Sequence, residues 1–255
     1  MKRPLTHASL CAAFAVLAVA LATSLLHAQT GASVPVAQEF EKLHFRSIGP
    51  AIMSGRISDF AVYEKDPAIF YVATAHGGVW KTTSGGSDFQ PIFDDVGMMS
   101  IGCVTVSQSN PDLVWVGTGE VNNRQTTSFG DGVYKSTDGG KSFQNMGLTR
   151  SQNVARIVID PANDNVVLVA SNGSLFGAGG DRGVFKSIDG GRTWKTVLAT
   201  DSLTGATELV MAPSDHRILY AATYQRRRFA LGMTGTGPGS ALWKSVDGGD
   251  TWTKL

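Results

Sequence analysis

Arginines, carboxylates and amides gather in three short segments of this chain, and these residue types suit the recognition of a polar ligand. An arginine fork can hold a carboxylate with two hydrogen bonds, while a carboxylate or an amide can pair with sugar hydroxyls or a peptide amine. The candidate ligand-binding residues are Glu120, Asn122, Arg124, Asp181, Arg182, Tyr224, Arg226, Arg227 and Arg228. The chemistry they predict is the binding of a glycan or a peptide.

Each candidate has an alternative role, because polar residues in a loop often stabilise that loop through their own hydrogen bonds. Their concentration in three segments is what favours a shared ligand. The sequence predicts neither a metal site nor a cofactor. His76 is isolated and is expected to be structural, and the residues around Asp138 lack the alternating oxygen ligands of a calcium loop.

The elements that must position these residues belong to a repeat. The segment GVYKSTDGGKSF at Gly132–Phe143 recurs at Gly183–Trp194 and Ala241–Trp252, and more weakly at Gly78–Phe89. Successive copies begin 54, 51 and 58 residues apart. Such a period is typical of β-propeller blades, each of which is a small antiparallel sheet of four strands. The predicted fold class is therefore all-β, with the blades forming an incomplete ring.

Each copy of this segment is expected to form a tight hairpin turn. Gly139 and Gly140 supply the positive φ angles, and the aspartate before them accepts hydrogen bonds from turn amides. The aromatic residue that ends the segment is expected to fill the gap between neighbouring sheets. The residues to which we assign this structural role, in preference to a catalytic or metal-binding one, are Asp138, Asp189, Asp247, Trp194 and Trp252.

A second repeat precedes each turn and pairs two strands around a Pro and Asp turn, with copies that begin at Tyr63, Ser107, Asp160 and Ala212. Each unit is thus predicted to contain four strands, A to D. Nearly all the length variation between units falls in the connection from strand B to strand C. In a four-stranded meander this connection lies at the end opposite the Gly-Gly turn. The candidate ligand residues lie in these B–C loops, where a rigid scaffold commonly carries its binding residues.

Composition agrees with a compact all-β chain and excludes one class of partner. Of 255 residues, 42% are hydrophobic and 17% charged, and the formal net charge is +1. This charge gives no electrostatic basis for nucleic-acid binding. Four blades are predicted over about 53–96, 97–149, 150–203 and 204–255, after a lead-in segment over 29–52.

Residues 1–28 have the pattern of a secretory signal peptide. Lys2 and Arg3 precede an apolar stretch over Leu10–Ala22, and a cleavage site is expected after Ala28. The alternative is an uncleaved membrane anchor. If the signal is removed, the mature protein is expected to be periplasmic or extracellular and to have no membrane span. Cys103 is then its one remaining cysteine.

The turn segment resembles the Asp box, S-x-D-x-G-x-T-W, of BNR-repeat propellers. With the HFRSIGP and SGRI segments that precede the first unit, it makes the chain similar to secreted bacterial propellers of the sortilin-like and xyloglucanase-like group. The first copy departs from the motif, with Ser84 in place of the aspartate and Asp88 and Phe89 at its last positions. Proteins of several functions share this motif, so the resemblance implies the fold more than the function.

Two further expectations follow from the resemblance. Similar propellers have larger rings, and Leu255 falls within the fourth strand D, so further blades are expected downstream in a longer protein. Closure of four blades is the alternative.

A glycoside hydrolase is the alternative function. In the xyloglucanases that this chain resembles, the general base is the Asp of a TDVGG segment. The corresponding stretch here, Thr74–Gly78, reads TAHGG, so that Asp is absent. The arginine of the sialidase FRIP motif is only weakly matched at Phe45–Pro50. The catalytic residues are unknown, and catalysis by this chain alone is not indicated. If it is an enzyme, the resemblance implies a fragment of a glycoside hydrolase. Its catalytic pair of carboxylates would then be completed by residues outside this chain.

Overall fold

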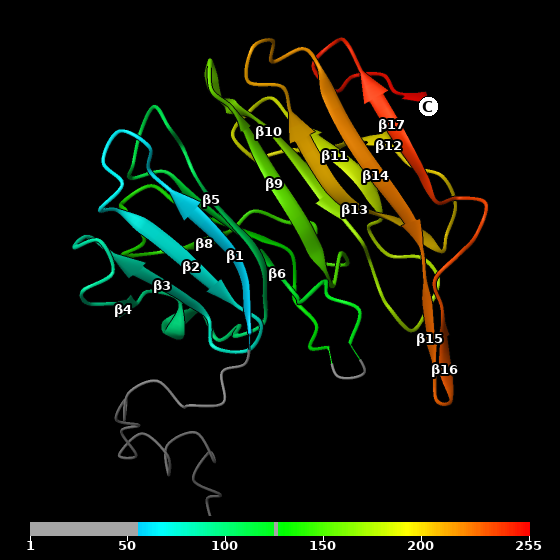
Figure 1. Ribbon diagram of the computed structural model, residues 1–255, viewed down its shortest axis with the longest axis horizontal. Helices are drawn as coiled ribbons and strands as arrows, with labels where there is room; N and C mark the ends of the chain where they lie inside the picture. The colour runs from blue at the N-terminus through cyan, green and yellow to red at the C-terminus, as the bar shows by residue number, and fades with distance from the viewer. Residues whose placement is uncertain (1–55, 125–126) are drawn as a thin grey trace, which may run out of the picture. The chain divides into compact units, whose positions relative to one another are not determined.

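The computed structural model describes residues 56–124 and 127–255, and almost all regular structure there is β-sheet (Figure 1). The predicted signal peptide and lead-in segment lie outside the described residues. The one helical element within the described part is a single 3₁₀ turn, Asp94–Val96. The predicted all-β class is confirmed.

Four antiparallel sheets of four strands follow one another along the chain, and we call them blades 1 to 4. Blade 1 contains β1 (Ile57–Val62), β2 (Phe70–Thr74), β3 (Val79–Thr82) and β4 (Gln90–Pro91). Blade 2 contains β5 (Ile101–Val106), β6 (Val114–Thr118), β7 (Val133–Ser136) and β8 (Gln144–Asn145). Blade 3 contains β9 (Val154–Asp160), β10 (Asn163–Ser171), β11 (Gly183–Ser187) and β12 (Lys195–Leu198). Blade 4 contains β13 (Thr204–Met211), β14 (Leu219–Gln225), β17 (Ala241–Ser245) and β18 (Thr253–Lys254).

The first strand of each blade, strand A, lies beside the first strand of the next. β1 contacts β5, β5 contacts β9, and β9 contacts β13. Within every blade the strands pair in chain order as a meander. The long B–C connections therefore emerge beside the beginnings of the A strands. In blade 4 this connection carries an extra hairpin of β15 (Arg227–Phe229) and β16 (Gly232–Thr234) (Figure 1).

A β-bulge interrupts the pairing of strands A and B at the same place in every blade. The register shifts at Ser58, Gly102, Ala155 and Thr207, each of which has no partner across the ladder. A bulge turns the following side chain away from its regular direction and is common next to functional sites. The residues that follow the bulges are Asp59, Cys103, Arg156 and Glu208.

The core lies between the blades, because both faces of the inner strands are covered. Tyr71 and Phe93 of blade 1 pack against blade 2. Trp115 of blade 2 packs against blade 3, and Leu168 of blade 3 packs against blade 4. Strands buried on both faces read as nearly continuous apolar runs, which is why β6 has the sequence VWVGT.

The Gly-Gly turns between strands C and D share one conformation. Gly139 and Gly140 have φ angles of 73° and 90°, and the corresponding angles in the other blades differ little. The Asp138 carboxylate accepts hydrogen bonds from the Ser136 and Ser142 hydroxyls, at 2.7 and 2.6 Å, and from the Ser142 amide at 2.9 Å. Asp189 and Asp247 make the same contacts in blades 3 and 4.

The rings that end the turn segments lie between blades. Trp194 of blade 3 meets Trp115 of blade 2 edge to face, with ring centroids 6.1 Å apart, and its Nε1 donates to the Met146 carbonyl oxygen at 2.7 Å. Trp252 of blade 4 packs against the cluster that joins blades 3 and 4.

Candidate functional site

The B–C loops of blades 2, 3 and 4 are tied together by the buried side chain of Arg226. Its Nε donates to Asn172 Oδ1 of the blade 3 loop at 3.1 Å. Its Nη1 donates to the Val121 carbonyl oxygen of the blade 2 loop at 2.7 Å and to Asn123 Oδ1. Burial lowers the pKa of Arg226 to about 10. The guanidinium therefore remains a cation at neutral pH and fixes the three loops relative to one another.

The Arg226 and Asn172 side chains retain unused donors. Arg226 Nη2 and Asn172 Nδ2 are both buried and make no hydrogen bond within the described part of the chain. Buried donors without partners are costly, so such groups commonly bind an ordered water or a ligand.

A second buried anchor lies at the end of β6. Glu120 is fully buried, and its carboxylate accepts hydrogen bonds from Arg56 Nε at 2.5 Å and from Asn122 Nδ2 at 3.2 Å. His76 Nε2 lies 3.6 Å from the same carboxylate. The Glu120 backbone carbonyl oxygen accepts from Asn153 Nδ2 of blade 3 at 2.6 Å. Glu120 thus links blades 1, 2 and 3 beneath the loop that carries Asn122.

A polar cavity of about 370 Å³ opens where these loops meet the A strands. All four bulge residues line it, and so do the ends of two B–C loops. Its lining is Ser58, Asp59, Gly102, Val121, Asn122, Asn123, Ala155, Arg156, Thr207, Glu208, Tyr224 and Arg226. Each blade therefore contributes its bulge residue to the lining, so the cavity forms only where all four blades pack together.

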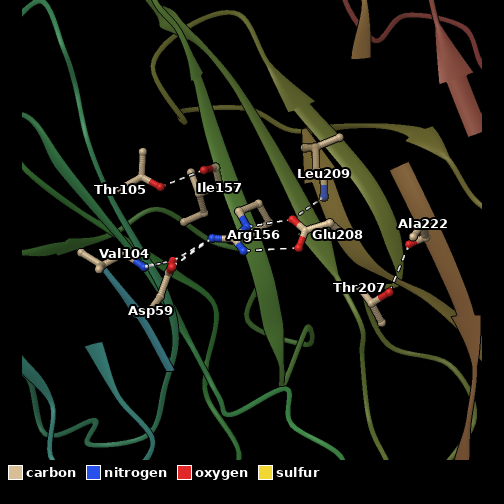
Figure 2. A network of polar contacts seen from close by, with 9 residues as sticks. All are labelled: Asp59, Val104, Thr105, Arg156, Ile157, Thr207, Glu208, Leu209 and Ala222. Carbon is tan, nitrogen blue, oxygen red and sulfur yellow. Dashed lines mark hydrogen bonds and ion pairs between the residues drawn. The ribbon is translucent and has the colours of Figure 1, made fainter. Parts of the chain in front are cut away.

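Arg156 crosses the wall of this cavity and binds two carboxylates from different blades (Figure 2). Its Nη1 donates to both oxygens of Asp59 at 3.0 Å, and its Nε donates to Glu208 Oε1 at 2.9 Å. Asp59 also accepts from the Val104 amide at 3.2 Å, and Glu208 from the Leu209 amide at 3.0 Å. Three side chains that follow bulges in blades 1, 3 and 4 are thereby joined.

Electrostatics favours the charged forms of Arg156 and Glu208. Burial is the largest influence on the pKa of Glu208 and raises it, but the hydrogen bonds from Arg156 and the Leu209 amide and the charge of Arg156 together hold that pKa below its ordinary value. Burial likewise lowers the pKa of Arg156, and the hydrogen bond to Glu208 and the charge of Asp59 raise it above its ordinary value. The network presents fixed hydrogen-bond acceptors and donors to the cavity at neutral pH.

The structure brings together some of the predicted site residues and separates others. Asn122, Tyr224 and Arg226 line the cavity, and Tyr224 Oη accepts from Asn123 Nδ2 at 3.4 Å. Glu120 lies buried beneath it, as described above. Arg124 is exposed in the same loop as Asn122.

The remaining predicted residues stabilise loops. Arg182 is buried and donates to four carbonyl oxygens of its own loop, including Asn172 O at 2.7 Å and Gly177 O at 2.6 Å, and burial lowers its pKa. Asp181 pairs with Arg150 at 3.0 Å. Arg227 and Arg228 belong to the extra hairpin, where the Arg227 guanidinium lies 5.4 Å from the Phe229 ring centroid.

Other hollows of the molecule repeat from blade to blade. A hollow of about 420 Å³ lies between Lys81 of blade 1 and the turn at Gly139. A hollow of about 280 Å³ lies at the equivalent place, between Lys135 of blade 2 and the turn at Gly190. Their recurrence marks them as features of the blade junctions.

A third hollow, of about 610 Å³, also borders Arg156 and Glu208, but much of its lining is apolar, including Val158, Leu209 and Met211. We take the polar loop-side cavity as the candidate site because the bulges of all four blades and the ends of two B–C loops line it.

Asp59, Arg156 and Glu208 are functional candidates that sequence reasoning missed. They lie on A strands, outside the variable loops. The available signal was their charge at one aligned position of strands that are otherwise apolar. Among the residues that the structure describes, no three His, Cys, Asp or Glu side chains are placed to hold a metal ion. No helix within the described ranges is long and apolar enough to cross a membrane.

Comparison with known proteins points to one kind of fold. A family model described as Sortilin-Vps10 (Sortilin, neurotensin receptor 3) matches residues 131–255. A xyloglucanase from Paenibacillus sp. is 25% identical over 221 residues, which cover 75% of this chain and 20% of the relative. The chain thus spans about a fifth of the length of that relative.

Two solved structures give the same result. An ancestral GH74 enzyme superposes with a TM-score of 0.59 at 22% identity, over 79% of this chain and 24% of the other. The GH74 xyloglucanase of Xanthomonas campestris gives a TM-score of 0.57 at 18% identity, over 77% of this chain and 29% of the other. These likenesses show a β-propeller fold. Together with the family model they confirm the resemblance to sortilin-like and xyloglucanase-like propellers.

Proposed function

From this similarity in fold and the geometry of the cavity, we propose that the chain binds a glycan where the B–C loops meet the A strands. The observation that carries the proposal is the convergence of four bulged A strands and two loops on one polar cavity. Bulges bend the A strands at one position in every blade, and the charged side chains that follow three of them, Asp59, Arg156 and Glu208, line the cavity.

The lining favours a glycan over a peptide. Asn122 and Asn123 offer amide donors and acceptors, and the Asp59 and Glu208 carboxylates are held in fixed positions by Arg156. A sugar ring carries hydroxyls that donate and accept in several directions, so it can use such a lining on all sides. A peptide commonly needs an apolar pocket for an anchoring side chain or a free strand edge, and the lining of this cavity is mainly polar.

The alternative is a glycoside hydrolase that uses the same cavity. The 25% sequence identity with a xyloglucanase favours this alternative. Glycoside hydrolysis needs one carboxyl group with a raised pKa that acts as general acid. Of the two carboxylates that line the cavity, Glu208 has a lowered pKa, and both are paired with Arg156. This pairing supports binding as the role of the described residues.

Secretion to the periplasm or the medium is part of the proposal. Its basis is the charged and apolar pattern of residues 1–28. N-terminal sequencing of the protein recovered from its producing cell is expected to begin after Ala28. A mature chain that begins at Met1 would contradict secretion through a cleaved signal.

Isothermal titration calorimetry of the intact chain with xyloglucan oligosaccharides, and separately with a random hexapeptide library, tests the choice of ligand. We expect the oligosaccharides to bind and Asn122→Ala and Tyr224→Ala each to weaken binding at least about tenfold, or roughly 1.4 kcal/mol. Arg124→Ala and Arg227→Ala extend the test to the exposed arginines of the same loops. Arg192→Ala, on a Gly-Gly turn at the other end of its blade, is the matched control.

Three outcomes would overturn this assignment. Equal losses from the cavity variants and from Arg192→Ala would place the ligand elsewhere. Binding of the hexapeptides alone would replace the glycan by a peptide. Turnover of the oligosaccharide that Glu208→Gln or Glu120→Gln abolishes would establish the hydrolase.

A further inference from the structure

Two exposed phenylalanine rings meet on the loops that carry cavity residues. Phe129 lies in the B–C loop of blade 2 and Phe176 in that of blade 3, and the two residues are 45% and 44% exposed. Their rings pack edge to face at 89°, with centroids 6.0 Å apart. We call this pair the aromatic ledge. It belongs to the two middle blades, each of which has a described blade on both sides.

The backbone on either side of Phe129 is held by the blades. The Ser100 hydroxyl donates to the Ser128 carbonyl oxygen at 3.0 Å, and the Gly130 amide donates to the Gln152 carbonyl oxygen at 2.7 Å. Ser100 directly precedes β5 of blade 2, and Gln152 lies shortly before β9 of blade 3. Phe129 is therefore fixed between two blades while its ring remains on the surface.

The loop around Phe176 is also constrained. The buried Arg182 side chain donates through Nη2 to the carbonyl oxygens of Ser174 and Gly177, at 2.5 and 2.6 Å, and so joins the two sides of the loop. Leu175 is 1% exposed, which anchors the residue before Phe176 in the protein interior. The chain thus buries Leu175 and leaves the neighbouring ring in solvent on a fixed backbone.

The aromatic ledge lies close to the candidate cavity. Phe129 shares its loop with Asn122, which lines the cavity. Phe176 follows Asn172 by four positions, so their backbones are at most about 14 Å apart. The Asn172 side chain accepts a hydrogen bond from Arg226 of the cavity wall. A ligand that enters the cavity can therefore reach the ledge if it is a few units long.

A glucose unit suits both surfaces. Its hydroxyls lie around the edge of the ring and match the polar lining of the cavity, whereas its two faces carry C–H groups. The face of an aromatic ring is electron-rich and attracts such C–H groups, and stacking also removes apolar area from water. Exposed apolar patches commonly mark binding sites, and this one lies on the loops that also carry the polar groups of the cavity.

We propose that the aromatic ledge is a second subsite, outside the cavity, on which further sugar units of the bound glycan stack. This role rests on the proposed glycan binding and adds a preference for long chains. The ligand is then an oligosaccharide or polysaccharide whose units occupy the cavity and the ledge together, and a disaccharide uses the cavity alone. Phe129 and Phe176 determine the preference for long chains, while Asn122 contributes to the binding of short and long ones.

Isothermal titration calorimetry of the full 255-residue chain with cellobiose and cellohexaose tests this preference. Both are unbranched chains of β-linked glucose and differ in length alone. We expect the wild type to bind cellohexaose at least about tenfold more tightly than cellobiose. Phe129→Ala and Phe176→Ala are each expected to remove most of this difference and to leave the affinity for cellobiose unchanged. Asn122→Ala is expected to weaken the binding of both sugars.

Two controls separate stacking from a structural role of the rings. Phe176→Trp keeps an aromatic face and is expected to retain the preference for cellohexaose, whereas Phe176→Leu keeps apolar bulk alone and is expected to lose it. Phe89→Ala is the matched control at a distance, because Phe89 is 42% exposed and also packs edge to face, on Phe70, at the Gly-Gly turn of blade 1. This variant is expected to bind both sugars as the wild type does.

Equal affinities of the wild type for the two sugars would overturn the aromatic ledge as a subsite and leave glycan binding by the cavity in place. Equal losses of cellobiose and cellohexaose affinity in the two alanine variants would contradict it too, because the rings would then support the loops. Binding of hexapeptides in place of both sugars, weakened by Phe176→Ala, would assign the ledge to a peptide. Failure of the wild type to bind either sugar would also overturn the ledge, and failure to bind the xyloglucan oligosaccharides as well would overturn the proposed function.

Discussion

Arg156 concentrates the electrostatics of the cavity in one side chain. It neutralises Asp59 and Glu208, which approach the same guanidinium from blades 1 and 4. Removal of the cation leaves two carboxylates near each other in a partly buried place, and the loss of one member of such a network costs more than the loss of an exposed ion pair. The role of Arg156 can therefore be measured from the free energy of unfolding and from whether that free energy rises or falls with pH.

We expect Arg156→Met to lower the free energy of unfolding at pH 7 by about 1 to 3 kcal/mol, a figure reduced from the fully buried case because the site is partly exposed. In the wild type the pKa of Glu208 lies below its ordinary value, so this stabilisation is present above an ordinary carboxyl pKa of 4.5 and is lost as the pH falls below it. In the variant the two carboxylates repel each other, and protonation of Glu208 relieves this repulsion, so stability grows as the pH falls toward that value. Urea unfolding across this pH range measures both.

The neutral combination Asp59→Asn, Arg156→Met, Glu208→Gln is the control for lost packing. It is expected to regain most of the stability at pH 7, because it leaves no uncompensated charge. A loss in Arg156→Met that does not change with pH would contradict the electrostatic role of Arg156.

Asp189 shows how one carboxylate stabilises a turn. The Thr193 hydroxyl, the Thr193 amide and the Ser187 hydroxyl donate to it and hold its pKa well below the ordinary value of 3.8. Its stabilising effect is therefore present above that ordinary value and disappears as the pH falls toward the folded one. We expect Asp189→Asn to lower the melting temperature by a few degrees at pH 7, with a difference from wild type that shrinks in acid. A variant with the wild-type melting temperature but without glycan binding would show that Asp189 acts on the ligand.

At the scale of the element, the Gly-Gly turn serves both as a hairpin and as a contact surface. Gly191 lies so close to the Trp115 ring of the preceding blade that an added Cβ would overlap it. Gly86 has the same φ of 91°, and its added Cβ would lie 3.5 Å from Phe70, an ordinary contact. Substitution of Gly86 therefore tests the need for a positive φ angle alone, whereas substitution of Gly191 also tests the packing against Trp115.

We expect Gly86→Ala to cost about 1 to 2 kcal/mol of unfolding free energy, the price of a positive φ. Gly191→Ala is expected to cost about 1 to 3 kcal/mol more, because it overpacks the junction of blades 2 and 3. Urea unfolding of the two variants measures the difference. Equal costs would mean that the turn of blade 3 does not press on Trp115.

Blade elements were predictable because each carries its own local signal. The Gly-Gly turn needs positive φ angles, and the aromatic residues of strand B need burial, so both leave fixed residue types at fixed spacing. The extra hairpin near Arg227 was predicted as a loop, since two strands of three residues are too short to show alternation. The bulges in the A strands leave no residue signature, because Ser58, Gly102, Ala155 and Thr207 differ in chemistry.

At the scale of the molecule, half of the cavity was beyond sequence reasoning. The loops that carry Asn122 and Tyr224 could be placed at one end of the blades from the meander alone. The meeting of Asp59, Arg156 and Glu208 depends on how far each blade rotates from the last, which is set by packing between blades and not by any local pattern.

The ion pair between Arg156 and Asp59 also has a consequence for the order in which the chain folds. Asp59 and Arg156 are 97 residues apart in the chain, whereas strands within a blade pair with near neighbours. Closing so long a loop is entropically costly until the intervening blades have formed, so we expect the bridge to form in the last steps of folding. We expect Arg156→Met to accelerate unfolding in stopped-flow experiments and to leave the refolding rate nearly unchanged. A slower refolding rate would mean instead that the first and third blades meet before the transition state, and that the bridge helps nucleate the fold.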